Sequence, residues 1–223
     1  MDRGFSTLPL QFSRREPAEM AATAKEFRDD LAMRRSVRHF STDPIPLEVV
    51  RDCIAAACTA PSGANKQPYT FCLVTDPEIK RGIRHAAERE EYENYHGRMP
   101  AEWVRELEPL GTDYNKPHLE EAPALVVVLR KSWEPEADGT RARNYYVAES
   151  TGIAVGFLIA ALHHAGLACL THTPAPMDFV ARILGRPDHE KAYLLLPVGY
   201  PAHDCQVPDI QRKSLSEMLV EYP

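Results

Sequence analysis

The sequence lacks the features that assign a chain to several large protein classes. Its 223 residues include five cysteines, an odd number with no CxxC pair. Most of them sit inside apolar runs, so buried and reduced thiols are the simpler interpretation. No set of His, Cys and Asp residues has zinc-ligand spacing, and we expect no metal site. Neither a P-loop nor a GxGxxG motif is present, which argues against the nucleotide-binding folds built on them.

Positive charge and long apolar runs are also scarce. The net charge of −6 argues against general binding to nucleic acid or to an anionic membrane, although it permits a local basic pocket. No stretch approaches the roughly eighteen apolar residues that cross a bilayer, and the start lacks the apolar core of a secretory signal. We therefore expect a cytoplasmic protein.

The apolar pattern predicts helices that alternate with short strands. Residues 1–17 have few apolar anchors and are expected to form an extended arm. The predicted helices are 18–34, 47–59, 79–95 and 145–167, and the predicted strands are 70–75, 124–130, 168–171 and 193–199. This alternation predicts an α/β (α+β) fold, in one domain of ordinary size.

A basic cluster follows the first predicted helix. Arg34, Arg35, Ser36 and Arg38 place three guanidiniums and a hydroxyl within five residues. The planar guanidinium suits phosphate, because it donates two parallel charge-assisted hydrogen bonds. Arg212-Lys213 could add a cation if the tail folds back. The alternative is a solvated basic patch that complements the dipole at a helix end.

A loop of small residues, Thr59–Pro68, connects a predicted helix to a predicted strand. It combines proline rigidity with the permissive Gly63, and Ser62 and Asn65 could bind the edge of a flat ligand. A plain connection without a ligand is the alternative.

Three polar residues, Thr171, His172 and Thr173, follow an apolar strand. In α/β proteins ligand-binding residues often lie there, so the two hydroxyls and the imidazole could meet the heteroatoms of a bound ring. His172 could equally be a structural histidine.

The run from Glu90 to Lys116 is too polar for a core element. Glu91 and Tyr95 are four residues apart and would share one helix face. Together with Lys116 they could bind both ends of a zwitterion: Glu91 its ammonium, Lys116 and Tyr95 its carboxylate. A solvated helix face is the alternative for these three side chains.

These segments together resemble the nitroreductase superfamily of FMN enzymes. The shared segments are RRSVRHFS and TAPSGANKQPYTF, and the resemblance covers about residues 30–220. The segments EEYENYHGRM, GTDYNKP and THTPAPM resemble the iodotyrosine deiodinase branch. The resemblance implies a nitroreductase-like fold with a central mixed sheet flanked by helices. It also implies a domain-exchanged homodimer with FMN at the interface. Residues 1–30 would form an arm and first helix, and residues 31–223 the FMN-binding domain, with a substrate lid at about 88–118.

The resemblance also implies roles for individual residues toward FMN. The phosphate would be held by Arg34, Ser36 and Arg212, the last chosen over Lys213, with Arg35 and Val37 lining the same turn. Arg38 would face the N1/C2 carbonyl side of the flavin ring, and Ser62 would reach the flavin of the partner subunit. Thr171, His172 and Thr173 would lie beside the ring, with Thr173 donating a hydrogen bond to N5 as the catalytic contact.

The activity implied is FMN-dependent reductive dehalogenation of halotyrosines, which releases halide and tyrosine. Glu91, Tyr95 and Lys116 would close over the substrate zwitterion, and the backbone N–H of Ala64 would bind the phenolate. The reductant is left unknown. A generalist FMN nitroreductase or quinone reductase that uses NAD(P)H is the nearest alternative, since it needs no zwitterion clamp. A flavin-binding protein without turnover and a flavin-free α/β dimer are the others.

Overall fold

The computed structural model describes residues 6–223, and the chain divides into two compact units, with the boundary in the sequence between Arg34 and Arg35. The first contains α1 (Pro17–Met33), close to the predicted 18–34. Pro17 suits the first turn, because its missing N–H would have no partner there. The helix ends where Arg34 turns extended and donates its N–H to the Leu31 carbonyl at 3.2 Å.

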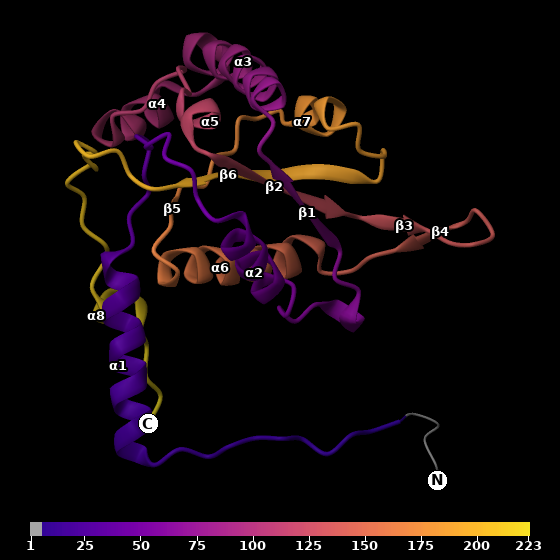
Figure 1. Ribbon diagram of the computed structural model, residues 1–223, viewed down its shortest axis with the longest axis vertical. Coiled ribbons are helices and arrows are strands. Elements are labelled where there is room, and N and C mark those ends of the chain that lie inside the picture. Colours follow the sequence, from indigo (N-terminus) through magenta and orange to yellow (C-terminus); the bar gives the residue numbers. More distant parts are fainter. Residues whose placement is uncertain (1–5) are drawn as a thin grey trace. The chain divides into compact units, whose positions relative to one another are not determined.

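The second unit, Arg35–Pro223, is built on a four-stranded sheet (Figure 1). Its strands, in spatial order, are β1 (Tyr69–Val74), β2 (Ala124–Lys131), β6 (Glu190–Gly199) and β5 (Ala168–Cys169). The ladders between these strands are antiparallel, whereas the isolated bridge from Ser36 to Cys169 is parallel. The expected mixed sheet flanked by helices is therefore confirmed.

Helices cover both faces of this sheet, which explains the continuous apolar run in β2 (Figure 1). Every β2 residue from Ala124 to Leu129 is fully buried. Successive strand side chains point to opposite faces. One set therefore packs against α2 (Leu47–Ala57) and α6 (Val147–His164). The other packs against α3 (Pro77–Glu93), α5 (His118–Glu121) and α7 (Asp178–Ile183).

Helix α6 corrects the expectation that no stretch approaches the roughly eighteen apolar residues needed to cross a bilayer. It is the one helix among the described residues that is long and apolar enough to cross a membrane, with 18 residues and a mean hydropathy of 1.3. Val155, Leu158 and Leu162 on this helix pack into the core beside the sheet. Core packing therefore accounts for the apolar residues on one side of the helix, whereas Ile153 and Phe157 on the same helix are 43% and 44% exposed.

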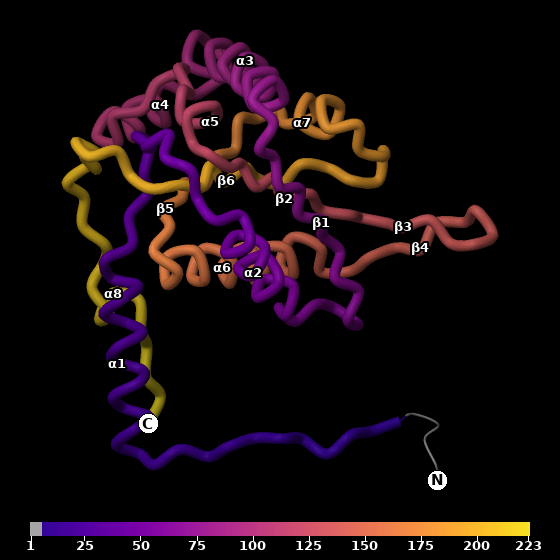
Figure 2. The backbone as a smooth tube through the Cα atoms, viewed as in Figure 1, coloured from indigo at the N-terminus to yellow at the C-terminus, as the bar shows by residue number. Residues whose placement is uncertain are grey.

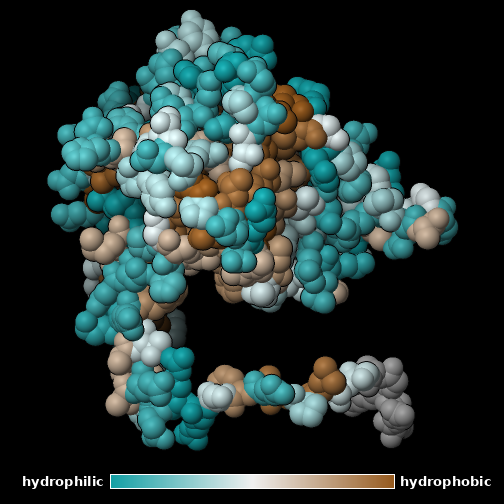
Figure 3. Space-filling model, in the orientation of Figure 1, coloured by the Kyte–Doolittle hydropathy of each residue, from teal (hydrophilic) through white to brown (hydrophobic). Residues whose placement is uncertain are grey.

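The connection from α3 to β2 carries the polar run noted in the sequence (Figure 2). The predicted helix to Tyr95 ends at Glu93, and a π-helical turn, η2 (Asn94–Arg98), follows. Next come α4 (Ala101–Leu107) and a 3₁₀ turn, η3 (Glu108–Leu110), which ends at a left-handed Gly111. The surface over α3 and α4 is mostly hydrophilic (Figure 3).

The remaining elements are short. The hairpin of β3 (Trp133–Pro135) and β4 (Arg141–Arg143) forms a separate two-stranded sheet. A 3₁₀ turn, η1 (Gly63–Asn65), precedes β1, and α8 (Leu215–Met218) lies near the C-terminus.

Candidate functional site

A cavity of about 350 Å³ lies where the α3–α5 connection meets the end of β5. Its lining brings together seven of the residues predicted from the sequence. These are Arg38, Glu91, Tyr95, Lys116, Thr171, His172 and Thr173. Residues far apart in the chain thus share one site.

The centre of this cavity is an ion pair between Glu91 and Lys116. Lys116 Nζ lies 3.6 Å from Glu91 Oε2, and the two side chains are 4% and 9% exposed. Burial raises the pKa of Glu91 and lowers the pKa of Lys116, and each charge partly offsets the effect on the other. Desolvation is the larger effect for both groups, so each charge remains costly to bury even with the other beside it. A ligand that carries both an ammonium and a carboxylate could stabilise both charges.

Tyr95, on the π turn η2, lies beside this pair. Its hydroxyl donates to the Thr112 carbonyl at 3.1 Å, and Lys116 Nζ is 5.7 Å from its ring centroid. Lys116 Nζ also donates to Thr112 Oγ1 at 3.1 Å and to the Asp113 carbonyl. The three predicted zwitterion ligands therefore form one connected group.

Backbone pairing at the β5 edge places Arg38 near the threonines. Val37 donates its N–H to the Cys169 carbonyl at 3.3 Å, beside the Ser36–Cys169 bridge. His172 and Leu195 exchange two backbone hydrogen bonds of 2.9 and 2.8 Å. This pairing buries His172 and leaves Thr171 and Thr173 exposed at the cavity. Burial lowers the pKa of Arg38, whose guanidinium is partly removed from water.

A second histidine in the lining, His118, was not predicted from the sequence. Its ring meets that of His172 edge to face, with centroids 5.4 Å apart. Burial lowers the pKa of His118 to about 3 and lowers that of His172 as well. Within residues 6–223, neither Nε2 atom has a hydrogen-bond partner. Only the position of His118 two residues after Lys116 hinted at a place in the site.

Ser62 and Ala64 do not line this cavity; they lie on the turn before β1. The Ser62 hydroxyl accepts the Gln67 N–H at 2.9 Å. Ala64 has a φ of +49°, in the left-handed region that is unusual for a residue with a Cβ. Backbone strain of this kind is concentrated at functional loops.

The basic cluster is divided between the two units. Arg34 belongs to the first unit, and Arg35, Ser36 and Val37 begin the second. A guanidinium nitrogen of Arg35 donates to the Pro208 carbonyl, which ties this turn to the C-terminal stretch that carries Arg212. Of the predicted phosphate residues, none lines the cavity itself.

The described chain offers no metal site: among residues 6–223, no group of three or more His, Cys, Asp and Glu side chains could hold an ion. The cavity lining supplies a guanidinium, hydroxyls, two buried imidazoles and a buried ion pair.

Comparison with known proteins places this arrangement in a family. The model of the nitroreductase family matches residues 31–200. The chain belongs to the nitroreductase family. Family members of known structure share its α/β architecture, so the expected fold is confirmed.

Relatives within the family are iodotyrosine deiodinases. The enzyme from Haliscomenobacter hydrossis is 53% identical over 96% of this chain and 97% of its own length. The enzyme from Drosophila melanogaster is 46% identical over 89% of this chain and 70% of its own length. A crystal structure of oxidized iodotyrosine deiodinase bound to FMN and 3-iodo-L-tyrosine matches with a TM-score of 0.75 and 32% identity. It covers 88% of this chain and 98% of that protein.

Proposed function

We propose that this nitroreductase-family protein is an FMN-dependent reductive dehalogenase of halotyrosines, releasing halide and tyrosine. The observation that carries the proposal is the buried Glu91–Lys116 pair, in a cavity that also holds Arg38 and Thr173. The iodotyrosine deiodinase relatives and the structure of one bound to FMN and 3-iodo-L-tyrosine support it.

The residues at the cavity fit FMN. Arg38 would complement negative charge on the flavin ring, and Thr171 and Thr173 offer hydroxyls that can meet its heteroatoms. The unpartnered Nε2 of buried His172 is a polar atom that a ligand could satisfy. Arg34, Ser36 and Arg212 would hold the phosphate, with Arg35 and Val37 lining the turn. When bound and reduced, FMN supplies the two electrons of the reaction.

The zwitterion of an amino acid fits the other side of the cavity. Its ammonium would pair with Glu91 and its carboxylate with Lys116 and Tyr95, so each buried charge gains a second partner of opposite sign. A substrate without these charges gains nothing from the pair. The pair therefore favours an amino acid over a simple aromatic compound.

The reaction balances with few protein groups. An aryl halide takes up two electrons and one proton and gives the arene and a halide ion, so the carbon–halogen bond breaks and a carbon–hydrogen bond forms. The backbone N–H of Ala64 would hold the phenolate oxygen of the substrate. Closure of the 88–118 lid would exclude water, so binding energy from the zwitterion organises the distant reacting centre.

A homodimer would complete the site. Ser62 and Ala64 lie outside the cavity of their own chain, so they would act at the flavin of the partner subunit. We accordingly propose a domain-exchanged dimer with FMN at its interface. Residues 1–30 would serve as an arm and first helix, and residues 31–223 as the FMN-binding domain. We also propose a cytoplasmic location, where a cellular reductant would reduce the oxidised flavin after each turnover.

The test is anaerobic reduction of the FMN-loaded protein with dithionite, followed by 3-iodo-L-tyrosine. Stoichiometric iodide and tyrosine are the expected products. Glu91→Gln should reduce this turnover strongly while leaving reduction of a nitroaromatic intact. A protein that reduces the nitroaromatic and releases no iodide is a general nitroreductase, and the proposal fails.

A further inference from the structure

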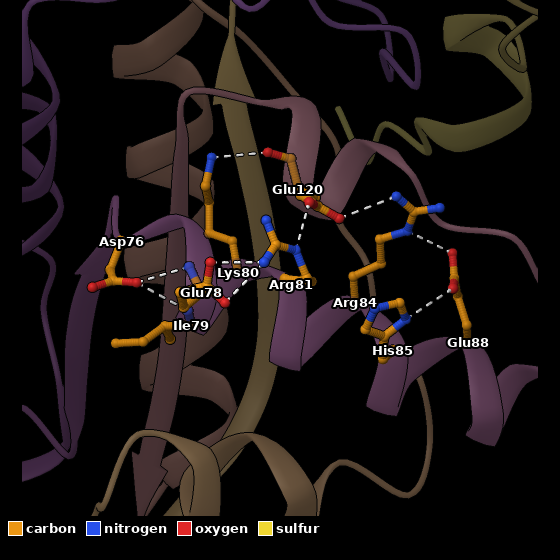
Figure 4. A network of polar contacts seen from close by, with 9 residues as sticks. All are labelled: Asp76, Glu78, Ile79, Lys80, Arg81, Arg84, His85, Glu88 and Glu120. Carbon is orange, nitrogen blue, oxygen red and sulfur yellow. Dashed lines mark hydrogen bonds and ion pairs between the residues drawn. The ribbon is translucent and has the colours of Figure 1, made fainter.

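One face of α3 carries a network of acidic and basic side chains that contacts Glu120 on α5 (Figure 4). Through Glu88 the same network contacts the backbone of Lys116. Within it, Arg84, Glu88 and Glu120 form what we call the Glu88 cluster. Arg84 Nε donates to Glu88 Oε1 at 2.8 Å, and Arg84 Nη1 donates to Glu120 Oε2 at 3.1 Å. One guanidinium thus joins α3 to α5.

Glu88 makes the contact that matters for the site. The same Oε1 atom accepts the backbone N–H of Lys116 at 2.8 Å. The Glu88 and Arg84 side chains are 19% and 29% exposed, so water competes weakly for these bonds. The hydrogen bond to Glu88 is the leading cause that raises the pKa of Arg84.

The other end of the Lys116 segment is fixed to α3 as well. Lys80 is buried and donates to the Glu120 carbonyl at 2.9 Å and the Ala122 carbonyl at 2.7 Å. Arg81 Nε donates to Glu120 Oε1 at 3.2 Å. The stretch from Lys116 to Ala122 is therefore tied to one helix at both ends.

That helix also carries Glu91. Glu88 and Glu91 are three residues apart on α3, so they lie about one turn apart along the helix. Glu88 holds the backbone of Lys116, and Glu91 meets its ammonium at 3.6 Å. The distance between the Glu91 carboxylate and the Lys116 ammonium is thus set by contacts to a single helix, α3.

We propose that Glu88, held by Arg84, is a positioning residue that sets Lys116 against Glu91. It is not among the residues that line the cavity, and it acts through the Lys116 backbone. Its effect on catalysis rests on the proposed halotyrosine activity, because the zwitterion is the group that needs both charges correctly spaced.

The variant that tests this is Glu88→Ala in the FMN-loaded protein. Loss of a charge-assisted hydrogen bond predicts that kcat/KM for 3-iodo-L-tyrosine falls about ten- to hundredfold, chiefly through KM. 2-Iodophenol lacks both charges, so its kcat/KM should stay at the wild-type value. Glu88→Gln keeps an oxygen acceptor for the Lys116 N–H and should recover part of the loss.

Glu78→Ala is the matched control. Glu78 is also an α3 carboxylate paired with an arginine, Arg81, at 2.7 Å, but its side chain is 75% exposed and its carboxylate bonds to Arg81 instead of the Lys116 segment. Its kinetics should match the wild type with both substrates. Arg84→Lys supplies a second route if Glu88→Ala folds poorly, because an ammonium cannot span Glu88 and Glu120 as the guanidinium does.

Hydrogen exchange of the FMN-loaded protein supplies a readout that needs no substrate. Amides of residues 113–121 should exchange about tenfold or more faster in Glu88→Ala than in the wild type or Glu78→Ala. Unchanged exchange, or an equal loss with 2-iodophenol and iodotyrosine, overturns the positioning role. Faster exchange in a protein that releases no iodide supports the positioning role and rejects the proposed function.

Discussion

Lys116 Nζ and Glu91 Oε2 are 3.6 Å apart inside a cavity that scarcely exposes either side chain. Burial acts against the charged form of both, raising the pKa of Glu91 and lowering the pKa of Lys116. A zwitterion would bring an ammonium to Glu91 and a carboxylate to Lys116, which favours both charged forms. Ligand binding should therefore be coupled to protonation of this pair.

The first prediction concerns the pH dependence of that binding. Glu91 must be ionised to bind the ammonium, and its pKa in the free protein is raised above 4.5. Affinity for 3-iodo-L-tyrosine should therefore decline as the pH falls through this raised pKa. Titration calorimetry of the oxidised, FMN-loaded protein at acid and neutral pH measures it. Glu91→Gln should bind more weakly and lose the acid decline; a variant with the wild-type pH profile would contradict the assignment.

A second prediction concerns the Tyr95 hydroxyl, which donates to the Thr112 carbonyl. Tyr95→Phe removes this bond between η2 and the segment before Lys116, so affinity for iodotyrosine should fall by about tenfold. Proteolysis within residues 88–118 should also become faster. Tyr92→Phe is the control, because the Tyr92 ring stacks on His96 and keeps that contact. Equal effects of the two substitutions would show that the Tyr95 hydroxyl has no special role.

Acid stability follows from His118, whose folded-state pKa of about 3 lies below its ordinary 6.5. Between these values the unfolded chain binds the extra proton, so stability is lost as the pH falls below 6.5. His118→Phe should reduce the loss between about pH 7 and about pH 5 by up to about 2 kcal/mol. Urea unfolding with saturating FMN measures this. The exposed His203, changed to Gln, should leave the acid loss unchanged. If the His118 imidazole were accessible to protons in the folded state, His118→Phe would also leave the acid loss unchanged, and this outcome would contradict the prediction.

Local pattern was enough to predict the long elements. The unbroken apolar run in β2 reflects burial between two layers of helices, and one side of α6 is apolar because it packs against the sheet. Burial of this kind leaves an apolar pattern in the sequence. The three-residue strands of the β3–β4 hairpin are too short for a period to be recognised, and α4 lies in a run read as polar. Sequence reasoning therefore located the core and missed the short pieces at its rim.

The site shows the same division. Glu91 and Tyr95 are close in sequence, so their proximity could be inferred from helical spacing, although the helix itself ends at Glu93. The contact of His118 with His172 and the bond from Glu88 to Lys116 depend on how α3, α5 and β6 pack. Such contacts join residues distant in the chain, and no local pattern encodes them.

The last prediction compares two glycines by the space around them. A Cβ on Gly199, at the end of β6, would lie 2.6 Å from Cδ of Pro123, a rigid ring just before β2. Gly199→Ala should therefore cost about 1–3 kcal/mol of unfolding free energy through overpacking. Gly82, inside α3, has no atom within 4 Å of a built Cβ, so Gly82→Ala should add about 0.5–1 kcal/mol through helix propensity. Urea unfolding of the FMN-loaded variants should give opposite signs. A neutral Gly199→Ala would mean that Pro123 moves aside at no cost, and the overpacking argument would then fail.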